Sequence, residues 1–251
     1  MANPYVINLD SRPDRWARLQ EDWKGAFELT RLPAIQESPG WVGCALSHVK
    51  VIEEAKQRGD PMVLVWEDDC KPRNRHPRAI RELWNEVSYK LLICRDQWDV
   101  VLGATSRAYK SATYNKGLST RNVDVYDLPH GFTTHWTLYN SSSYDRMIEW
   151  KNVRSPQIDV YLFQNFRVKT IIPFLAGQVP GYSDIEGMER DYDSWFDGTE
   201  TSISGTKQQT LASLVHKAPA VQFPKFMTRS ILVSRIVYCF ARSWFAWITG
   251  R

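Results

Sequence analysis

Hydrophobic and polar positions in the first part of the chain follow two different periods. Residues 5–9 form a short apolar run, and residues 16–27 then carry apolar side chains at helical spacing. Residues 43–56 repeat apolar positions at steps of three and four, which predicts an amphipathic helix that the Gly-Asp-Pro sequence at 59–61 stops. Residues 62–66 are continuously apolar, as in a strand covered on both faces, and three acids follow them.

The same alternation continues further along the chain. A polar helix is expected around 78–92, a buried strand over 98–103, a threonine-rich and aromatic strand over 132–139, a helix over 142–150 and a last strand over 169–172. Ser155 followed by Pro156 predicts an N-cap and a first helical residue, so that Asp159 lies in the first turn of the next helix.

Strands that alternate with helices predict an α/β domain with a mostly parallel sheet flanked by helices. Ligands of such sheets bind at the carboxyl ends of the strands, where the triplet at 67–69 lies. We expect this domain to span 1–185. Seven acids between 184 and 200, with one arginine, predict an acidic loop or linker over 186–205, and a basic tail would occupy 206–251.

Composition narrows the class of protein. The chain has 251 residues, 43% hydrophobic and 24% charged, which excludes a collagen-like or low-complexity chain and favours one domain with a tail. Its four cysteines form no CxxC pair, so neither a zinc knuckle nor a disulfide framework is indicated and reduced thiols are expected. An apolar strand begins almost at the first methionine without a signal peptide, which predicts a cytoplasmic protein, free or peripheral at a membrane.

The net charge of +4 conceals an asymmetry. Residues 201–251 hold seven lysines and arginines and no acid, which leaves 25 basic and 28 acidic residues, or −3, for the rest. Residues 230–249 are apolar and aromatic, with Arg235 and Arg242 on one face of a helix. This pattern is typical of an amphipathic helix in a lipid headgroup layer, and we expect an anionic membrane surface as a partner. The alternative is a C-terminal helix packed on the domain, with its basic residues solvated.

Three consecutive acids, Glu67, Asp68 and Asp69, follow the apolar strand at 62–66. Their mutual repulsion costs free energy unless a cation, hydrogen bonds or proton uptake relieves it. Hard oxygen ligands without a cysteine-histidine pattern favour Mg²⁺ or Mn²⁺ over zinc. A solvated acidic turn after a core strand is the alternative interpretation.

Several segments, taken in order, resemble one enzyme family. The sequence V-I-N-L-D-S-R-P-D-R at 6–15 is similar to the I-N-L-x-x-R-x-D-R opening of glycosyltransferase family 25, which includes lipopolysaccharide and collagen galactosyltransferases. G-C-A-L-S-H at 43–48, the apolar strand with E-D-D at 63–69, I-D at 158–159 and S-D-I at 183–185 resemble its later signatures. The resemblance covers about residues 4–185, and Trp66, where the family usually has an aliphatic residue, departs from it.

The resemblance implies a Rossmann-like GT-A fold, a nucleotide-sugar donor such as a UDP-hexose, a Mn²⁺-type or Mg²⁺ ion and inversion at the anomeric carbon. Glu67 and Asp69 would hold the ion as an E-x-D variant of the D-x-D motif, with Asp68 near the ribose or the waters of the ion. The loop after the first strand would also contact the donor, through Asn8, Leu9, Arg12 and Arg15. The two arginines are alternatively surface ion-pair partners.

The remaining candidates lie in the other matched segments. Ser47 and His48 would line the donor site, although a helix histidine is more often a structural hydrogen-bonding group. An inverting transfer needs a general base, for which Asp159 and Asp184 are the candidates. The dipole of the helix also favours a carboxylate at Asp159 for structural reasons alone.

These patterns lead to one main hypothesis and two rivals. The main hypothesis is a metal-dependent, inverting glycosyltransferase that moves a hexose, with galactose or glucose favoured, to a glycan, a lipid-linked glycan or a protein. A metal-dependent phosphodiesterase or nuclease would use the same acids with a second metal. A non-catalytic module would bind membrane or nucleic acid through its tail, although nucleic acid is not the favoured partner.

Overall fold

The computed structural model describes residues 3–108, 112–185 and 187–217, with side chains as far as residue 207. The chain divides into two compact units, Met1–Leu211 and Ala212–Arg251, and the sheet and the cavity described below belong to the first. The helix expected at 230–249 lies outside the described residues. None of the helices in the described part of the chain has an apolar stretch long enough to cross a bilayer.

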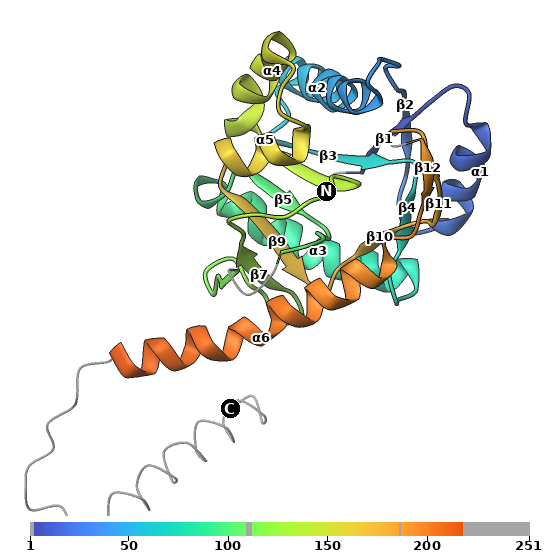
Figure 1. Ribbon diagram of the computed structural model, residues 1–251. Helices are drawn as coiled ribbons and strands as arrows, with labels where there is room; N and C mark the ends of the chain where they lie inside the picture. The colour runs from blue at the N-terminus through green and yellow to red at the C-terminus, as the bar shows by residue number, and fades with distance from the viewer. Residues whose placement is uncertain (1–2, 109–111, 186, 218–251) are drawn as a thin grey trace, which may run out of the picture. The chain divides into compact units, whose positions relative to one another are not determined.

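An eight-stranded sheet forms the centre of the first unit (Figure 1), in the order β2-β1-β3-β8-β5-β9-β7-β6. Its strands are β1 Tyr5–Asn8, β2 Thr30–Pro33, β3 Met62–Glu67, β5 Val100–Leu102, β6 Thr113–Tyr114, β7 Asp124–Asp127, β8 Trp136–Asn140 and β9 Val168–Ile172. The helices are α1 Pro13–Asp22, α2 Gly40–Arg58, α3 Pro77–Ile93, α4 Tyr144–Val153, α5 Ile158–Asn165 and α6 Asp193–Lys217.

Strand direction agrees with the expected mostly parallel α/β sheet, except that β8 and β7 run opposite to the other strands. β1 pairs in parallel with β2 and β3, and β5 pairs in parallel with β9. β8 is antiparallel to both β3 and β5, and β7 is antiparallel to β9. The α/β class is therefore confirmed, and the antiparallel insertion of β8 adds a feature that hydrophobic periodicity does not reveal.

Helices cover both faces of the sheet. The side chains of α2, α4 and α5 share one apolar cluster with the sheet, and those of α1 and α3 share another. Figure 1 shows α2, α4 and α5 above β3 and α3 below it. β3 is the strand between the two clusters: Val63 and Val65 belong to the first, and Leu64 and Trp66 to the second. Alternating side-chain direction in a strand explains why this run has to be apolar throughout.

Trp66, the residue that departs from the family pattern, fills an aromatic cluster on the α1 and α3 face. Its ring centroid lies 4.6 Å from that of Trp23 and 4.3 Å from that of Trp136, and Phe27 packs edge-on at 5.0 Å. All three indoles are fully buried. The departure is therefore a matter of core packing and leaves the acids that follow it in place.

Helix α2 confirms the amphipathic helix expected over 43–56. Gly59 ends it in the left-handed conformation, with φ 72°, and its N–H bonds to the last turn. At the other end, a Cβ on Gly43 would collide with the Ile35 carbonyl oxygen, so glycine is required for α2 to approach the loop after β2.

Helix α5 begins later than the sequence indicates. The expected N-cap at Ser155 is wrong: the helix starts at Ile158 with Gln157 as its N-cap. The Pro156 carbonyl instead accepts a hydrogen bond from Trp150 Nε1 at 2.9 Å, which ties this segment to α4. Asp159 nevertheless lies in the first turn of α5, as predicted.

The loop or linker expected over 186–205 is also wrong. β12 (Met188–Arg190) forms a hairpin with β11 (Gly181–Ser183), and α6 begins at Asp193. The acids of α6 are neutralised by cations of β4 (Cys70–Pro72) and of the residue after it. Lys71 donates to Asp193 at 2.5 Å, and the buried Arg73 pairs with Asp197. Acidic composition alone does not show such partners, which lie more than 100 positions earlier.

Candidate functional site

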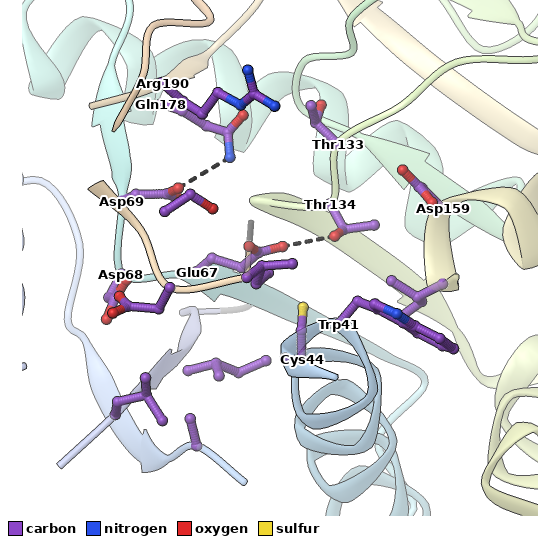
Figure 2. A pocket seen from close by; sticks show the side chains of 18 of the residues that line it. Trp41, Cys44, Glu67, Asp68, Asp69, Thr133, Thr134, Asp159, Gln178 and Arg190 are labelled. Carbon is purple, nitrogen blue, oxygen red and sulfur yellow. Dashed lines mark hydrogen bonds between the residues drawn. The ribbon is translucent and has the colours of Figure 1, made fainter. Parts of the chain in front are cut away.

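A cavity of about 790 Å³ opens where β1 and β3 end. It is bounded by the loop after β1, the start of α2, residues 132–134, the start of α5 and the β11–β12 hairpin. A cavity of this size accommodates a ligand larger than a single sugar. The end of β3 forms its floor, where the three acids lie (Figure 2).

Strand pleating separates the acids. Glu67 continues the face of Val63 and Val65 and lies on the α2 side, whereas Asp68 points to the α1 side. Figure 2 shows Asp68 apart from Glu67 and Asp69. The triplet is therefore divided, with two carboxylates toward the cavity centre and one toward α1.

Glu67 is held by two side chains. Thr134 Oγ1 donates to Glu67 Oε1 at 2.7 Å, and His48 Nε2 lies 3.6 Å from the same oxygen. Burial raises the pKa of Glu67, but the His48 imidazole and the Thr134 hydroxyl outweigh it and leave that pKa below its usual value. Glu67 is therefore ionised at neutral pH.

Asp69 has an unsatisfied oxygen. Its Oδ2 accepts from Gln178 Nε2 at 3.1 Å, whereas the buried Asp69 Oδ1 and Gln178 Oε1 have no hydrogen-bond partner among the described residues. Burial, followed by the charges of Glu67 and Asp68, raises the pKa of Asp69 to about 8. Once Asp69 has lost its proton, both unsatisfied oxygens are acceptors, as a bound cation requires.

Asp68 belongs to a separate hydrogen-bond network. It accepts from Asn8 Nδ2 at 2.7 Å and from Arg15 at 3.0 Å, and Arg18 donates to its carbonyl at 2.9 Å. Asn8 also donates to the Arg12 carbonyl and accepts from Arg31. Burial raises the pKa of Asp68, and Asn8 and Arg15 oppose that rise. Asp68 thus organises the loop after β1.

Arg12, Arg15 and Asp184 connect this loop to the β11–β12 hairpin. Asp184 Oδ2 lies 2.6 Å from Arg12 and 3.2 Å from Arg15, and Arg15 also donates to the Tyr182 carbonyl. Arg15, Asp184 and the predicted Leu9 line the cavity, whereas Arg12 and Asn8 lie behind its wall. Asp184 is therefore engaged by two cations.

Asp159 faces the cavity from the opposite side. Its Oδ1 accepts from the Val160 N–H at 2.8 Å, and among the described residues no cation pairs with its carboxylate. Burial raises its pKa, and the charge of Glu67 adds to that effect. Figure 2 shows it across the cavity from Asp68, on the side of Thr133 and Thr134.

Ser47 and His48 do not line the cavity. Ser47 Oγ accepts from the Ile35 N–H at 2.8 Å and donates to the Gly43 carbonyl at 2.7 Å, so it connects α2 to the loop after β2. His48 is fully buried, and its Nδ1 lies 3.0 Å from the Tyr139 hydroxyl. Both residues support the site from behind.

Several lining residues escaped the sequence analysis. Thr134 and Gln178 contact the acids. Five aromatic side chains also line the cavity and are called its aromatic rim: Trp41, Phe132, Tyr182, Tyr192 and Trp195. Arg107 lies 4.1 Å over the Trp195 ring. Cys44 also lines the cavity, and it is the residue of this group that the sequence could have indicated. It precedes His48 by four positions and so lies on the same face of the helix.

The donor set fits a hard divalent cation. Glu67 offers an ionised carboxylate, and Asp69 and Gln178 offer buried oxygens without donors among the described residues. Mg²⁺ and Mn²⁺ commonly take one or two carboxylates and complete their shell with phosphate or water oxygens. Glu67 and Asp69 are thus the residues that would hold such an ion.

Comparison with known proteins adds little. No family model and no curated protein matches the chain. The structure of A197 from STIV is 11% identical in sequence and has a TM-score of 0.40. The alignment covers 75% of this chain and 93% of the A197 chain. An apo UDP-glucose pyrophosphorylase is 9% identical over 82% of each chain, with a TM-score of 0.37. A putative glucose-1-phosphate thymidylyltransferase from Bacillus anthracis is 13% identical over 88% of this chain and 78% of its own, with a TM-score of 0.34. Similarities this weak carry no argument about activity.

Proposed function

We propose that this chain is a metal-dependent, inverting glycosyltransferase. It transfers a hexose from a nucleotide-sugar donor, and a UDP-hexose is the favoured donor. The observation that carries the proposal is convergence in space. Five separated segments resemble family 25, and each contributes at least one residue to the same cavity: Leu9 and Arg15, Cys44, the acids at 67–69, Ile158 and Asp159, and the segment 183–185. Unrelated similarities would have no reason to meet in one cavity.

Glu67 and Asp69 bind the cation in this proposal. A bound Mn²⁺ or Mg²⁺ neutralises charge that develops on the departing diphosphate. Arg15 lies at the same end of the cavity and offers a guanidinium to phosphate oxygens. Asp68 keeps Arg15 in place through their 3.0 Å ion pair.

Asp159 is the general base in this proposal, and Asp184 is not. Asp184 is held in ion pairs by Arg12 and Arg15, so its carboxylate oxygens are already engaged. Burial raises the pKa of Asp159, and no cation among the described residues pairs with its carboxylate, so the carboxylate is available to an acceptor hydroxyl. It takes the proton from the attacking acceptor hydroxyl while the C–O bond to the diphosphate breaks.

The aromatic rim supports a sugar-containing acceptor. Trp41 and Trp195 are partly exposed residues of the cavity lining and offer flat apolar faces to a sugar ring. The acceptor is a glycan, free, lipid-linked or on a protein.

Thermal unfolding with UDP, with and without Mn²⁺, tests the proposal. A ligand present at about 100 times its Kd stabilises by about 2.7 kcal/mol, so we expect a clear Mn²⁺-dependent rise in Tm. Asp69→Asn keeps the side-chain shape and should remove the rise and hexose transfer. Asp145→Asn, on the exposed surface of α4, is the matched control and should behave as wild type.

Two results would contradict the proposal. One is turnover by Asp69→Asn equal to wild type. The other is the absence of any nucleotide response together with metal-dependent phosphodiester cleavage, which would favour the phosphodiesterase alternative.

A further inference from the structure

One group of side chains at the cavity floor has a chemistry different from that of the oxygen site. Cys44 and His48 lie one turn apart on the same face of α2, and Glu67 lies at the end of β3 opposite them. One ligand atom from each lies within 4.8 Å of the other two. Figure 2 shows the Cys44 sulfur pointing toward Glu67. The group therefore offers one sulfur, one nitrogen and one oxygen to a common centre.

His48 provides a second, independent observation. Its side chain is fully buried, and Nε2 has no hydrogen-bond partner among the described residues. Nε2 points to Glu67 Oε1, 3.6 Å away, which is too long for a hydrogen bond. Nε2 is thus a buried ligand atom that no hydrogen bond occupies, next to a carboxylate that is also a ligand group.

Tyr139 orients the imidazole. Its hydroxyl lies 3.0 Å from His48 Nδ1, and this residue is itself buried on β8. In the metal-bound form, Nδ1–H would donate to this hydroxyl and Nε2 would direct its lone pair to the ion. Histidine ligands of metals are held in this way by a partner on the other ring nitrogen.

The group is accessible from one side only. Cys44 and Glu67 line the cavity, whereas His48 lies behind them. An ion would enter from the cavity, take three protein ligands and keep one position open. Three protein ligands with one open position is a common arrangement for protein-bound zinc.

We propose that Cys44, His48 and Glu67 form a second cation site, selective for a thiophilic divalent ion such as Zn²⁺. Sulfur and imidazole ligands select against Mg²⁺ and Mn²⁺, which prefer oxygen. On binding, the Cys44 thiol releases its proton to solvent and the thiolate sulfur donates an electron pair to the ion. No oxidant or reductant is needed.

The two sites share Glu67, and this consequence rests on the proposed function. An ion held by Cys44 and His48 draws the Glu67 carboxylate away from Asp69. Zn²⁺ therefore competes with the Mn²⁺-dependent binding of the nucleotide. The second site would make the enzyme sensitive to zinc at concentrations too low to displace Mn²⁺ from an oxygen site directly.

Direct binding tests the site without reference to activity. Full-length protein is dialysed against Zn²⁺, and bound metal is counted by elemental analysis; Co²⁺ replaces Zn²⁺ for absorption spectroscopy. We expect one high-affinity ion per chain and a sulfur-to-cobalt charge-transfer band. Cys44→Ser should abolish the band and weaken binding at least tenfold. Cys94→Ser, a free cysteine at the end of α3, is the matched control and should retain both.

The outcomes distinguish failure of the second cation site from failure of the proposed function. No charge-transfer band in wild type, or unchanged zinc affinity in Cys44→Ser with native circular dichroism, overturns the site. If wild type binds zinc with the band, the site holds even when no nucleotide is bound under any condition, and only the proposed function fails. Zinc inhibition of UDP binding that disappears in Cys44→Ser supports the shared Glu67.

Discussion

Two carboxylates face the cavity in opposite electrostatic settings, and this difference assigns their roles. Asp184 lies against two guanidinium groups, whereas Asp159 lies at a helix start and has a raised pKa. This difference favours Asp159 over Asp184 as the general base of the proposed function.

Asp159→Asn should therefore lower kcat for hexose transfer by about 10²- to 10⁴-fold, the range for loss of a general base. Nucleotide affinity should not change, because the Asp159 carboxylate lies across the cavity from Arg15 and Asp68. Steady-state kinetics with isothermal titration of UDP and Mn²⁺ measures both quantities. A normal kcat would move the base to Asp184 or to a water molecule.

Asp69 makes cation binding dependent on pH. Its pKa of about 8 means that the side chain is protonated at pH 7, so a cation has to displace that proton. Affinity for Mn²⁺ should rise about tenfold for each pH unit up to about pH 8 and then level off. Calorimetry in two buffers of different ionisation enthalpy should show release of about one proton per ion at pH 7. Affinity that stays constant from pH 6 to pH 8 would show that Asp69 is not a ligand.

The sequence predicted part of the site because strand geometry is local. The acids at 67–69 end an apolar strand, and their position at the carboxyl edge follows from that fact alone. Their separation into two directions follows from pleating. The contacts with Thr134 and Gln178 could not be predicted, because they depend on which distant segments pair with β3 and β4.

At the scale of elements, α6 shows why the acidic composition of residues 186–205 led to the wrong prediction of a loop or linker. Its first turns are acidic and read as a linker, yet Phe196 and Ile203 are fully buried against the domain. Arg73 makes the difference: it is only 5% exposed, lies 3.5 Å from Glu200 and stacks over Phe196 at 5.4 Å. The sequence does not reveal this helix because the cations that neutralise its acids, Lys71 and Arg73, lie in β4 and directly after it.

Arg73→Ala should lower the free energy of unfolding by about 2 kcal/mol. This is less than the roughly 3 to 5 kcal/mol for breaking a fully buried pair, because Asp197 is 69% exposed. Urea unfolding measures the change, and hydrogen exchange should increase mainly in α6. Lys56→Ala removes an exposed pair with Asp145 and should change stability by less than about 0.5 kcal/mol. Equal effects of the two substitutions would contradict a role for Arg73 in docking α6.

At the scale of the whole chain, charge is divided between the domain and the tail. Residues 201–251 carry +7 and the rest −3. Deletion of 228–251 should reduce sedimentation with anionic phosphatidylserine vesicles, and wild-type binding should weaken as salt rises. UDP affinity should be retained by the same variant. Unchanged vesicle binding after the deletion would exclude the tail as the membrane contact.

The position of the reversed strand β8 determines when the central sheet can assemble during synthesis. β8 lies between β3 and β5 in the sheet, and both of these strands are synthesised before it. Until β8 has been made, β3 and β5 cannot be joined through it. At about 5 to 20 residues per second, several seconds pass before Asn140 follows Leu102. During that interval β3 lacks its partner β8, and an unpaired apolar strand edge is prone to aggregation in an incomplete chain. β8 is thus the strand whose arrival joins the two halves of the sheet and covers that edge.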